Sequence, residues 1–477
     1  MAFSVTNAGI STMPSKMTLA ANYLDFTGAG NDFAQQYLPE LYEQEVERFG
    51  NRTVSGFLQM VGAEMPMTSD QVIWSEQNRL HLAYNAATIA DKDAGGIAGL
   101  TAHAIRANQT IIVNDGFTSV KAVVKTSNTN DIVAYPYTET TWPQAFEDAS
   151  ALNVFVYGSE FHKGTGAMTD SIEPSFTQQE NSPIIIKDLY EINGSDTAQI
   201  GWVEVATEDG TSGYLWYLKS ESETRLRFQD YLEMACVEGE LASAGSGIGA
   251  GFADNNPLNA STNTAAKGTQ GLFAALTDRG NVWQDFAGAA APGSGALGDF
   301  DAILKQLDNN GAIEENMLFL NRTTALDFDD MIAAQAGGGY ASSASASYGV
   351  FSNDAEMALN FGFSGFRRGS YDFYKTDWKY LNDAATRGLT SDIDGVLVPA
   401  GTSTVYDQML GQNIRRPFLH VRYRASETED RRLKTWITGS VGGAYTSGDD
   451  KMSVHFLSER CLCVQGANNF VLMTSTS

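Results

Sequence analysis

The stretch KDLYEINGSDTAQIGWVEV, from Lys187 to Val205, decides which fold the sequence predicts. Asn193-Gly194 is a preferred pair for a type I′ turn, because both central residues of that turn need positive φ. The runs on either side predict strands, so a hairpin is expected over residues 184–206. An isolated two-stranded hairpin is only marginally stable in water, and both arms of this one carry apolar residues. A surface outside the hairpin must therefore cover it.

The apolar side chains of this hairpin are expected to be buried against a neighbouring subunit. Burying one such side chain is worth roughly 1.5–3 kcal/mol. The neighbouring sequence offers no obvious core, and a helix of another copy is the natural cover. The residues predicted to make this contact are Ile184, Ile186, Leu189, Ile192, Asn193, Gly194, Ile200 and Trp202.

The clearest helix in the chain follows the hairpin and is predicted over residues 214–242, ended by a glycine-rich segment. Its basic residues Arg225 and Arg227 each follow a glutamate by four positions, the favourable order for an ion pair along a helix. The apolar residues do not form one stripe, which predicts a helix contacted on several sides. The contact residues predicted on it are Leu218, Arg225, Arg227, Phe228 and Leu232.

Other parts of the chain predict a mixed α+β protein. Residues 104–157 consist of short β-rich pieces separated by Asn, Asp, Gly and Ser, and predict a small barrel of four or five strands. Residues 1–35 have no period and are expected to form an extended arm, with a helix from about Pro39 to Gly50 after it. A helix, a strand and a helix are predicted between 300 and 336, and strands again from 393 onward.

The composition limits the class of protein. The 477 residues are 43% hydrophobic, which allows two to four domains and a sizeable core. The net charge of −26 argues against a surface that grips nucleic acid or anionic membranes. Cys236, Cys461 and Cys463 have no disulfide-framework spacing and favour a reducing compartment. There is no visible signal peptide and no run of about 20 apolar residues, so no membrane partner is expected.

No converging catalytic machinery is visible, so the chain is not expected to be an enzyme, and no catalytic residue, cofactor or metal is predicted. The glycine run 245–251 lacks the strand and helix that flank a dinucleotide-binding loop. Cys461 and Cys463 with His455 would need further ligands to hold a metal, and buried thiols are the plainer interpretation. The five histidines are scattered through unlike contexts.

Two further segments could have a chemical role, but an ordinary structural role is the preferred interpretation of each. Asp329 and Asp330 are adjacent on a predicted helix, point different ways and are expected to lie on a solvated face. The segment FRRGSYDFYKTDWKYL, residues 366–381, mixes basic and aromatic residues and could in principle hold single-stranded nucleic acid. The acidic total charge favours a subunit or domain contact there instead.

Three stretches in order, VFVYGSEFHKGTG, PIIIKDLYEINGSDTAQIGW and YLWYLKSESETRLRFQDYLEM, resemble the major capsid proteins of tailed bacteriophages, especially the large-genome and crAss-like lineages. The resemblance covers about 155–240 well and 300–475 more loosely. It implies the Hong Kong 97-like fold, an α+β fold with an N-terminal arm, an E-loop hairpin, a P-domain with a long spine helix, and an A-domain. The small β-barrel would be an insertion. Some family members join subunits by a crosslink near the E-loop tip, where this chain has no lysine, so none is expected.

The resemblance implies the following division of the chain: an N-terminal arm, 1–35; a helix and the start of the P-domain, 36–103; the inserted barrel, 104–157; the E-loop region, 158–212, with its hairpin at 184–206; the spine helix, 213–245; the A-domain, 246–395; and C-terminal strands of the P- and A-domains, 396–477.

The function implied by the resemblance is a major capsid protein that assembles into hexamers and pentamers of an icosahedral head around double-stranded DNA. Expected partners are other copies of the chain, scaffolding, portal and decoration proteins, and packaged DNA without specific binding. Because the numbering begins at Met1, no cleaved propeptide is expected. The expected location is the virion capsid, assembled in the host bacterial cytoplasm. Two alternatives stay open: a non-viral, encapsulin-like shell, and an enzyme with a Gly-rich loop.

Overall fold

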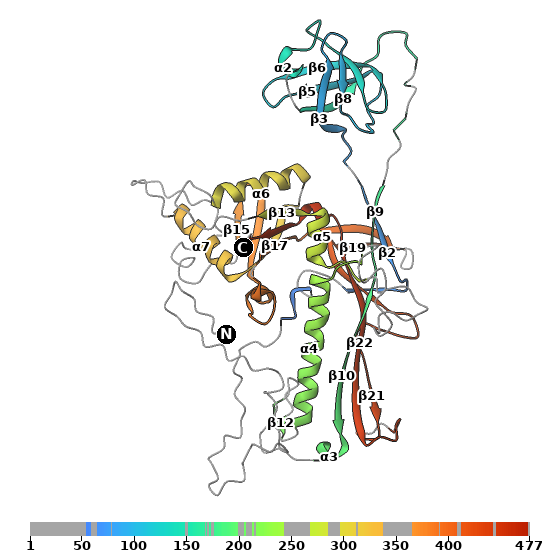
Figure 1. Ribbon diagram of the computed structural model, residues 1–477, viewed down its shortest axis with the longest axis vertical. Helices are drawn as coiled ribbons and strands as arrows, with labels where there is room; N and C mark the ends of the chain where they lie inside the picture. The colour runs from blue at the N-terminus through green and yellow to red at the C-terminus, as the bar shows by residue number, and fades with distance from the viewer. Residues whose placement is uncertain are drawn as a thin grey trace. The chain divides into compact units, whose positions relative to one another are not determined.

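The protein is described by a computed structural model (Figure 1). Two compact units are distinguished: Met1–Arg52, Leu189–Leu226 and Ile437–Val454 form the first, and Thr53–Asp188, Arg227–Trp436 and His455–Ser477 form the second. The structure describes residues 54–58, 64–77, 79–147, 151–166, 168, 171–172, 176–198, 205–206, 212–213, 216–242, 268–284, 296–311, 313–336, 365–390, 392–407, 412–441 and 445–475. The predicted N-terminal arm, the helix at Pro39–Gly50 and the glycine run 245–251 lie outside these residues.

A six-stranded mixed sheet forms one part of the second unit. Its strand order is β13 (Asn281–Gln284), β23 (Val471–Thr474), β17 (Ile393–Pro399), β14 (Glu315–Leu320), β16 (Tyr371–Asp377) and β15 (Gly365–Arg368). Helices α6 (Ala296–Asn310) and α7 (Arg322–Ala336) flank β14 in the chain, which confirms the predicted helix, strand and helix. The C-terminal strand β23 lies between β13 and β17, so the last residues of the chain complete this sheet.

The aromatic residues of segment 366–381 form the core of the chain itself. Phe366, Tyr371 and Phe373 are buried in one apolar cluster with Phe300 and Phe328 of the helices. Trp378, Tyr380 and Leu381, at and in the short helix α9 (Lys379–Asn382), are buried in a second cluster. These side chains are therefore not exposed for the expected subunit contact, and the alternative, a contact between domains, stays a prediction. Alternation along β16 turns Tyr371 and Phe373 inward.

The basic residues of the same segment are held by carboxylates. Lys375 donates to Asp329 at 2.5 Å and its side chain is nearly buried. Arg368 donates to Asp301 through two nitrogens, at 2.5 and 2.7 Å. Asp329, predicted on a solvated face, is partly exposed, and β16 beside α7 brings Lys375 to it as an ion-pair partner.

A five-stranded sheet is built from distant parts of the chain. Strand β1 (Glu64–Met67) is parallel to β20 (Leu419–Arg424), which is antiparallel to β22 (Lys451–Val464). Strands β10 (Ile184–Asn193) and β21 (Lys434–Gly439) also pair with β22. The predicted strands near 417–425 and 451–473 are confirmed. Elsewhere β18 (Thr402–Asp407) pairs with β19 (Gln412–Pro417), and β11 (Val205–Ala206) with β12 (Ser212–Gly213).

The long helix predicted after the hairpin is confirmed as α4 (Trp216–Glu238). Ser220, Thr224, Phe228, Leu232 and Cys236 follow one another at intervals of four and are all buried. The ring of Phe228 lies 5.8 Å from that of Phe456 on β22, so Phe228 packs onto the five-stranded sheet. Near the C-terminal end of α4, Cys236 and Val237 join a core with α5 (Leu272–Arg279) and the six-stranded sheet. Residues on other faces are half-buried, as expected of a helix contacted on several sides.

The predicted small barrel is present and closed, but it has six strands and begins earlier. Its order is β3 (Ala83–Asp91), β4 (Gly96–Ala98), β7 (Ile132–Pro136), β6 (Ser119–Ser127), β5 (Gln109–Asn114) and β8 (Leu152–Ser159), back to β3; the short helix α2 (Gln144–Glu147) precedes β8. The start at 104 and the four or five strands were wrong. In β3 the alternation of inward and outward side chains is interrupted at Ala86, which has φ of 65°. Strand β4 has only three residues. Neither sequence therefore shows the alternating pattern that predicts a strand.

Candidate inter-subunit surfaces

Strand β10 presents two different faces. Ile184, Ile186 and Ile192 lie on the same face, because side chains alternate along a strand, and Ile192 is 4% exposed. Ile185 and Leu189 lie on the opposite face and are 53% and 50% exposed. The predicted contact residues of β10 therefore lie on both faces. Ile184, Ile186 and Ile192 face the interior of the protein, whereas Leu189 is exposed on the outer face, next to Ile185, which was not predicted.

The predicted type I′ hairpin turn at Asn193-Gly194 is wrong. Asn193 is extended, with φ of −76° and ψ of 152°, and a helical turn, α3 (Gly194–Thr197), follows it. The Gly194 N–H donates to the backbone oxygen of Asp450 at 3.0 Å, and the Asp450 carboxylate occupies the space where a Cβ of residue 194 would stand. Gly194 has no positive φ, and a larger side chain there would displace only the end of the Asp450 side chain, so neither feature requires a glycine.

The other predicted contact residues have mixed positions. Asn193 is exposed and Gly194 half-buried. On α4, Arg225 and Arg227 are half-buried, while Phe228 and Leu232 are buried in the chain itself. Ile200, Trp202 and the side chain of Leu218 lie outside the described residues. Of the second predicted arm, the structure describes Val205 and Ala206, which form β11.

Sequence reasoning missed a second two-stranded element. Strands β2 (Val72–Gln77) and β9 (Phe176–Asn181) pair antiparallel, and the whole barrel is inserted between them in the chain (Figure 1). Gln77 lies opposite Phe176, so the two connections to the barrel leave from adjacent positions. We call β2 and β9 the ribbon. The alternation in VIWSEQ was a signal for it, but its partner strand lies about a hundred residues away in sequence.

One face of the ribbon is fixed to the body of the second unit. Val72 and Trp74 pack on a small apolar cluster of Met67, Cys461 and Cys463. Glu76 accepts hydrogen bonds from the Trp74 indole and the Gly466 N–H, both at 3.0 Å. On the opposite face of β2, Ile73 is exposed.

Asn181 fixes the end of β9. Its amide nitrogen donates to the backbone oxygens of Leu462, at 2.6 Å, and Gln270, at 2.9 Å, and the side chain is almost completely buried. Its side-chain oxygen accepts the Gln270 N–H at 2.8 Å. A buried amide with every bond satisfied specifies a single position for the strand.

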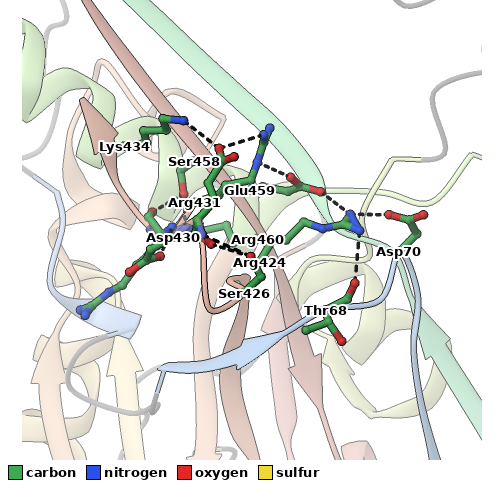
Figure 2. Close-up of polar contacts among 12 residues, drawn as sticks. Thr68, Asp70, Arg424, Ser426, Asp430, Arg431, Lys434, Ser458, Glu459 and Arg460 are labelled. Carbon is green, nitrogen blue, oxygen red and sulfur yellow. Dashed lines mark hydrogen bonds and ion pairs between the residues drawn. The ribbon is translucent and has the colours of Figure 1, made fainter. Parts of the chain in front are cut away.

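A cluster of charged side chains fixes the chain just before the ribbon (Figure 2). Glu459 on β22 is paired with Arg424 on β20 at 2.9 Å and with Arg431 at 2.7 Å, and its side chain is 7% exposed. Arg424 also pairs with Asp70, two residues before β2, and its guanidinium donates to the Thr68 backbone oxygen at 3.3 Å. The buried carboxylate is compensated by two cations, as a buried charge requires.

The same cluster extends to β1. Glu64 is paired with Arg432 and, at 3.5 Å, with Arg460. Arg460 and the Ser458 hydroxyl both donate to the Arg432 backbone oxygen, at 2.9 and 2.6 Å. These bonds join the β20–β21 connection, β22 and β1 into one network, so the base of the ribbon is set by contacts between segments more than 350 residues apart.

Two carboxylates on α4 hold the backbone at the start of the second unit. Asp230 accepts the N–H groups of Val54 and Ser55, both at 3.0 Å. Glu233 accepts those of Gly56 and Phe57, at 2.7 and 2.8 Å. Burial raises the pKa of Glu233, and its bonds to these amides partly offset that effect. The four consecutive amides are thus fixed to one face of α4.

The three cysteines are buried and carry no disulfide. Cys461 and Cys463 are adjacent on one face of β22, and the hydrogen bond between them raises the pKa of Cys461 and lowers that of Cys463, on which His420 also acts. His455 instead stacks on Trp436, with ring centroids 5.0 Å apart. Within the described ranges, no group of His, Cys, Asp or Glu has an arrangement that could hold a metal ion. Nor is any helix among those residues long and apolar enough to cross a membrane.

Comparison with solved structures finds matches over most of the chain at low identity. One is described as the capsid of a native GTA particle, with 10% identity and a TM-score of 0.39 over 94% of this chain and 98% of that chain. The capsid of cyanophage P-SCSP1u has 9% identity and a TM-score of 0.36, over 97% and 100%. A structure from Microbacterium phage Oxtober96 has 10% identity and a TM-score of 0.37, over 91% and 96%. No protein-family model and no curated protein matches the chain.

Proposed function

We propose that this protein is the subunit of a bacteriophage capsid and acts by assembly rather than by catalysis. The observation that carries the proposal is the exposed apolar face of β10, where Ile185 and Leu189 stay half exposed on a strand whose other face is already packed. Exposed apolar side chains that gather on one face mark contact surfaces more often than isolated ones do. The sequence stretches that resemble tailed-phage capsid proteins include this strand and α4.

The finer picture is that copies associate into hexamers and pentamers of a closed shell that encloses double-stranded DNA. Many modest interfaces between identical copies add up in such an assembly. Scaffolding, portal and decoration proteins would be its other partners, and assembly would take place in the host bacterial cytoplasm. The acidic chain would not adhere to the packaged DNA, because like charges repel.

The contact surface we propose differs from the sequence-based hypothesis in one respect. The E-loop was assigned to residues 184–206, yet β10 is a strand of the five-stranded sheet. The ribbon is the two-stranded element with a fixed base and an exposed apolar residue, Ile73, on its outer face. We therefore assign the reaching arm to the ribbon and its barrel, and assign β10, with α4, to the P-domain.

The test is assembly of the purified full chain, measured by light scattering after size exclusion and by electron microscopy. We expect capsomers or shells for the parent protein. The double variant Ile185→Asp with Leu189→Asp should shift the protein toward monomer, because two charges cannot be buried without partners. A chain that stays monomeric at all concentrations and with its expected scaffolding protein would contradict the proposal.

The matched control is Leu389→Asp, which changes an exposed leucine outside these strands. It introduces the same charge and should leave assembly unchanged. Circular dichroism of all variants shows whether a loss of assembly reflects a loss of folding.

A further inference from the structure

The outer surface of the barrel carries a group of exposed aromatic side chains. These are Tyr135, Tyr137, Phe155 and Tyr157, each between 39% and 48% exposed, and we call them the aromatic platform. They come from β7 and β8 and the residues directly after them. The barrel interior is filled by its own apolar residues, so the platform stands on a closed core.

The platform is assembled by tertiary structure, because β7 and β8 are separated by β6 and β5 in the barrel order. Tyr137 donates its backbone N–H to the Lys121 oxygen on β6 at 3.1 Å. Tyr157 is the extra residue of a bulge in β8, between Val156, paired with Ile111, and Gly158, paired with Thr110. A bulge redirects a side chain. The Tyr157 side chain lies within hydrogen-bonding reach of the Tyr137 side chain, although their strands are not neighbours in the barrel.

A carboxylate lies where these tyrosines meet. The Tyr137 hydroxyl donates to the carboxylate of Glu160, and the pKa of Tyr137 is raised by desolvation first, then by Glu160 and Tyr157. Tyr137 therefore stays a hydroxyl donor at neutral pH. The Glu160 carboxylate has further lone pairs that can accept hydrogen bonds from a ligand.

Lysines border the other side of the platform. The Lys125 ammonium lies 5.6 Å from the centre of the Tyr135 ring. Ile112 on β5 is paired with Lys121 on β6 on one side and with Phe155 on β8 on the other. Lys121 and Phe155 therefore lie in one row across the three strands. Donors and acceptors of both charges thus surround flat apolar rings.

These features select a class of ligand. Residues 83–160 contain eight Asp and Glu against four Lys and Arg, so a polyanion such as nucleic acid would be repelled. The lysines beside the rings disfavour a polycation. A neutral sugar chain fits both conditions: the C–H faces of sugar rings are attracted to the negative faces of aromatic rings, and sugar hydroxyls bond to carboxylate and ammonium groups. We propose that the aromatic platform binds a neutral carbohydrate chain.

The experiment uses the full chain on an array of neutral and acidic glycans, followed by titration calorimetry with the neutral glycan retained most strongly. We expect binding to neutral glycans. Tyr137→Ala and Tyr157→Ala should each weaken it by at least tenfold, and Glu160→Gln by several-fold. Tyr157→Phe should keep most of the affinity, since the ring remains.

The control is Phe117→Ala at the tip of the β5–β6 hairpin, where the side chain is 99% exposed and belongs to no platform contact. It should bind as the parent does. The proposal is overturned if no neutral glycan on the array is retained, if single-stranded DNA or acidic glycans are preferred, or if the two tyrosine variants bind like the parent. Since the changed side chains point outward, thermal unfolding of the barrel should be unaltered, which separates lost contacts from lost folding.

Discussion

The apolar side chains of the barrel strands and those of the five-stranded sheet are covered in opposite ways. The barrel closes on itself, and all the residues of its core come from between Tyr84 and Val156. The sheet collects its five strands from three distant segments, 64–67, 184–193 and 419–464, and leaves Ile185 and Leu189 exposed on β10. A barrel has no unpaired edges and needs no partner. The comparison indicates that the barrel is a self-sufficient insertion, whereas the sheet and α4 depend on long-range contacts.

The largest expected effect is confined to the barrel. Trp142 is fully buried there and donates its indole N–H to the Ala134 oxygen at 2.9 Å. Trp142→Ala should cost about 3–5 kcal/mol, because it opens a cavity and leaves that oxygen without its donor. Hydrogen exchange should show loss of protection in β3–β8 alone, with Phe117→Ala as a neutral control. Equal loss of protection in α4 would contradict the independence of the barrel.

A matching change in α4 should destabilise α4 and the five-stranded sheet and leave the barrel unchanged. Phe228→Ala removes the ring that packs on Phe456 and should destabilise α4 and the five-stranded sheet by roughly 3–5 kcal/mol. Barrel amides should keep their protection. Tyr231→Ala, an exposed position one turn along the same helix, should cost much less. If both variants lower the free energy of unfolding equally, the contact between Phe228 and Phe456 does not stabilise α4 on the sheet.

A smaller effect is expected at the base of the ribbon. Glu459→Gln leaves Arg424 and Arg431 without their shared carboxylate, and should cost about 2 kcal/mol in chemical unfolding, less than a fully buried pair because both arginines are partly exposed. Asp70→Asn changes the other partner of Arg424, which is largely exposed, and should cost close to nothing. A reversed order would mean that the exposed pair fixes the ribbon.

The smallest effect is a pH dependence at α4. Because burial raises the pKa of Glu233 above its ordinary 4.5, the folded protein takes up this proton before the unfolded chain does. The contribution of Glu233 to stability therefore rises as pH falls through the folded pKa and is complete below 4.5. In urea unfolding between pH 4 and 7.5, the parent should gain stability relative to Glu233→Gln as the pH falls, because the glutamine does not titrate. Parallel curves would be inconsistent with a raised pKa.

Much of the fold was accessible to sequence reasoning where the signal was local. Helix α4, the strands β5–β8 and the β14–α7 pair were each predicted from their own residues, since period and turn chemistry act within a few positions. The surfaces were less accessible. The ribbon needs two strands separated by the entire barrel, and β10 has its partner β22 more than 250 residues later. The aromatic platform, too, depends on a bulge and a barrel order that no local pattern contains.

The sequence by itself determined the longer helices and the strands with a clear local pattern, that the chain is acidic, and that apolar strands outnumber the cores visible in their neighbourhood. Tertiary structure alone decided the conformation of Asn193-Gly194, the closure of the barrel through β3, and which side of β10 stays exposed. The physical reason is that local preferences are worth fractions of a kcal/mol to about 1 kcal/mol per residue. A hydrogen bond to a distant segment, such as the one from Gly194 to Asp450 just before β22, together with the packing around it, is enough to override them.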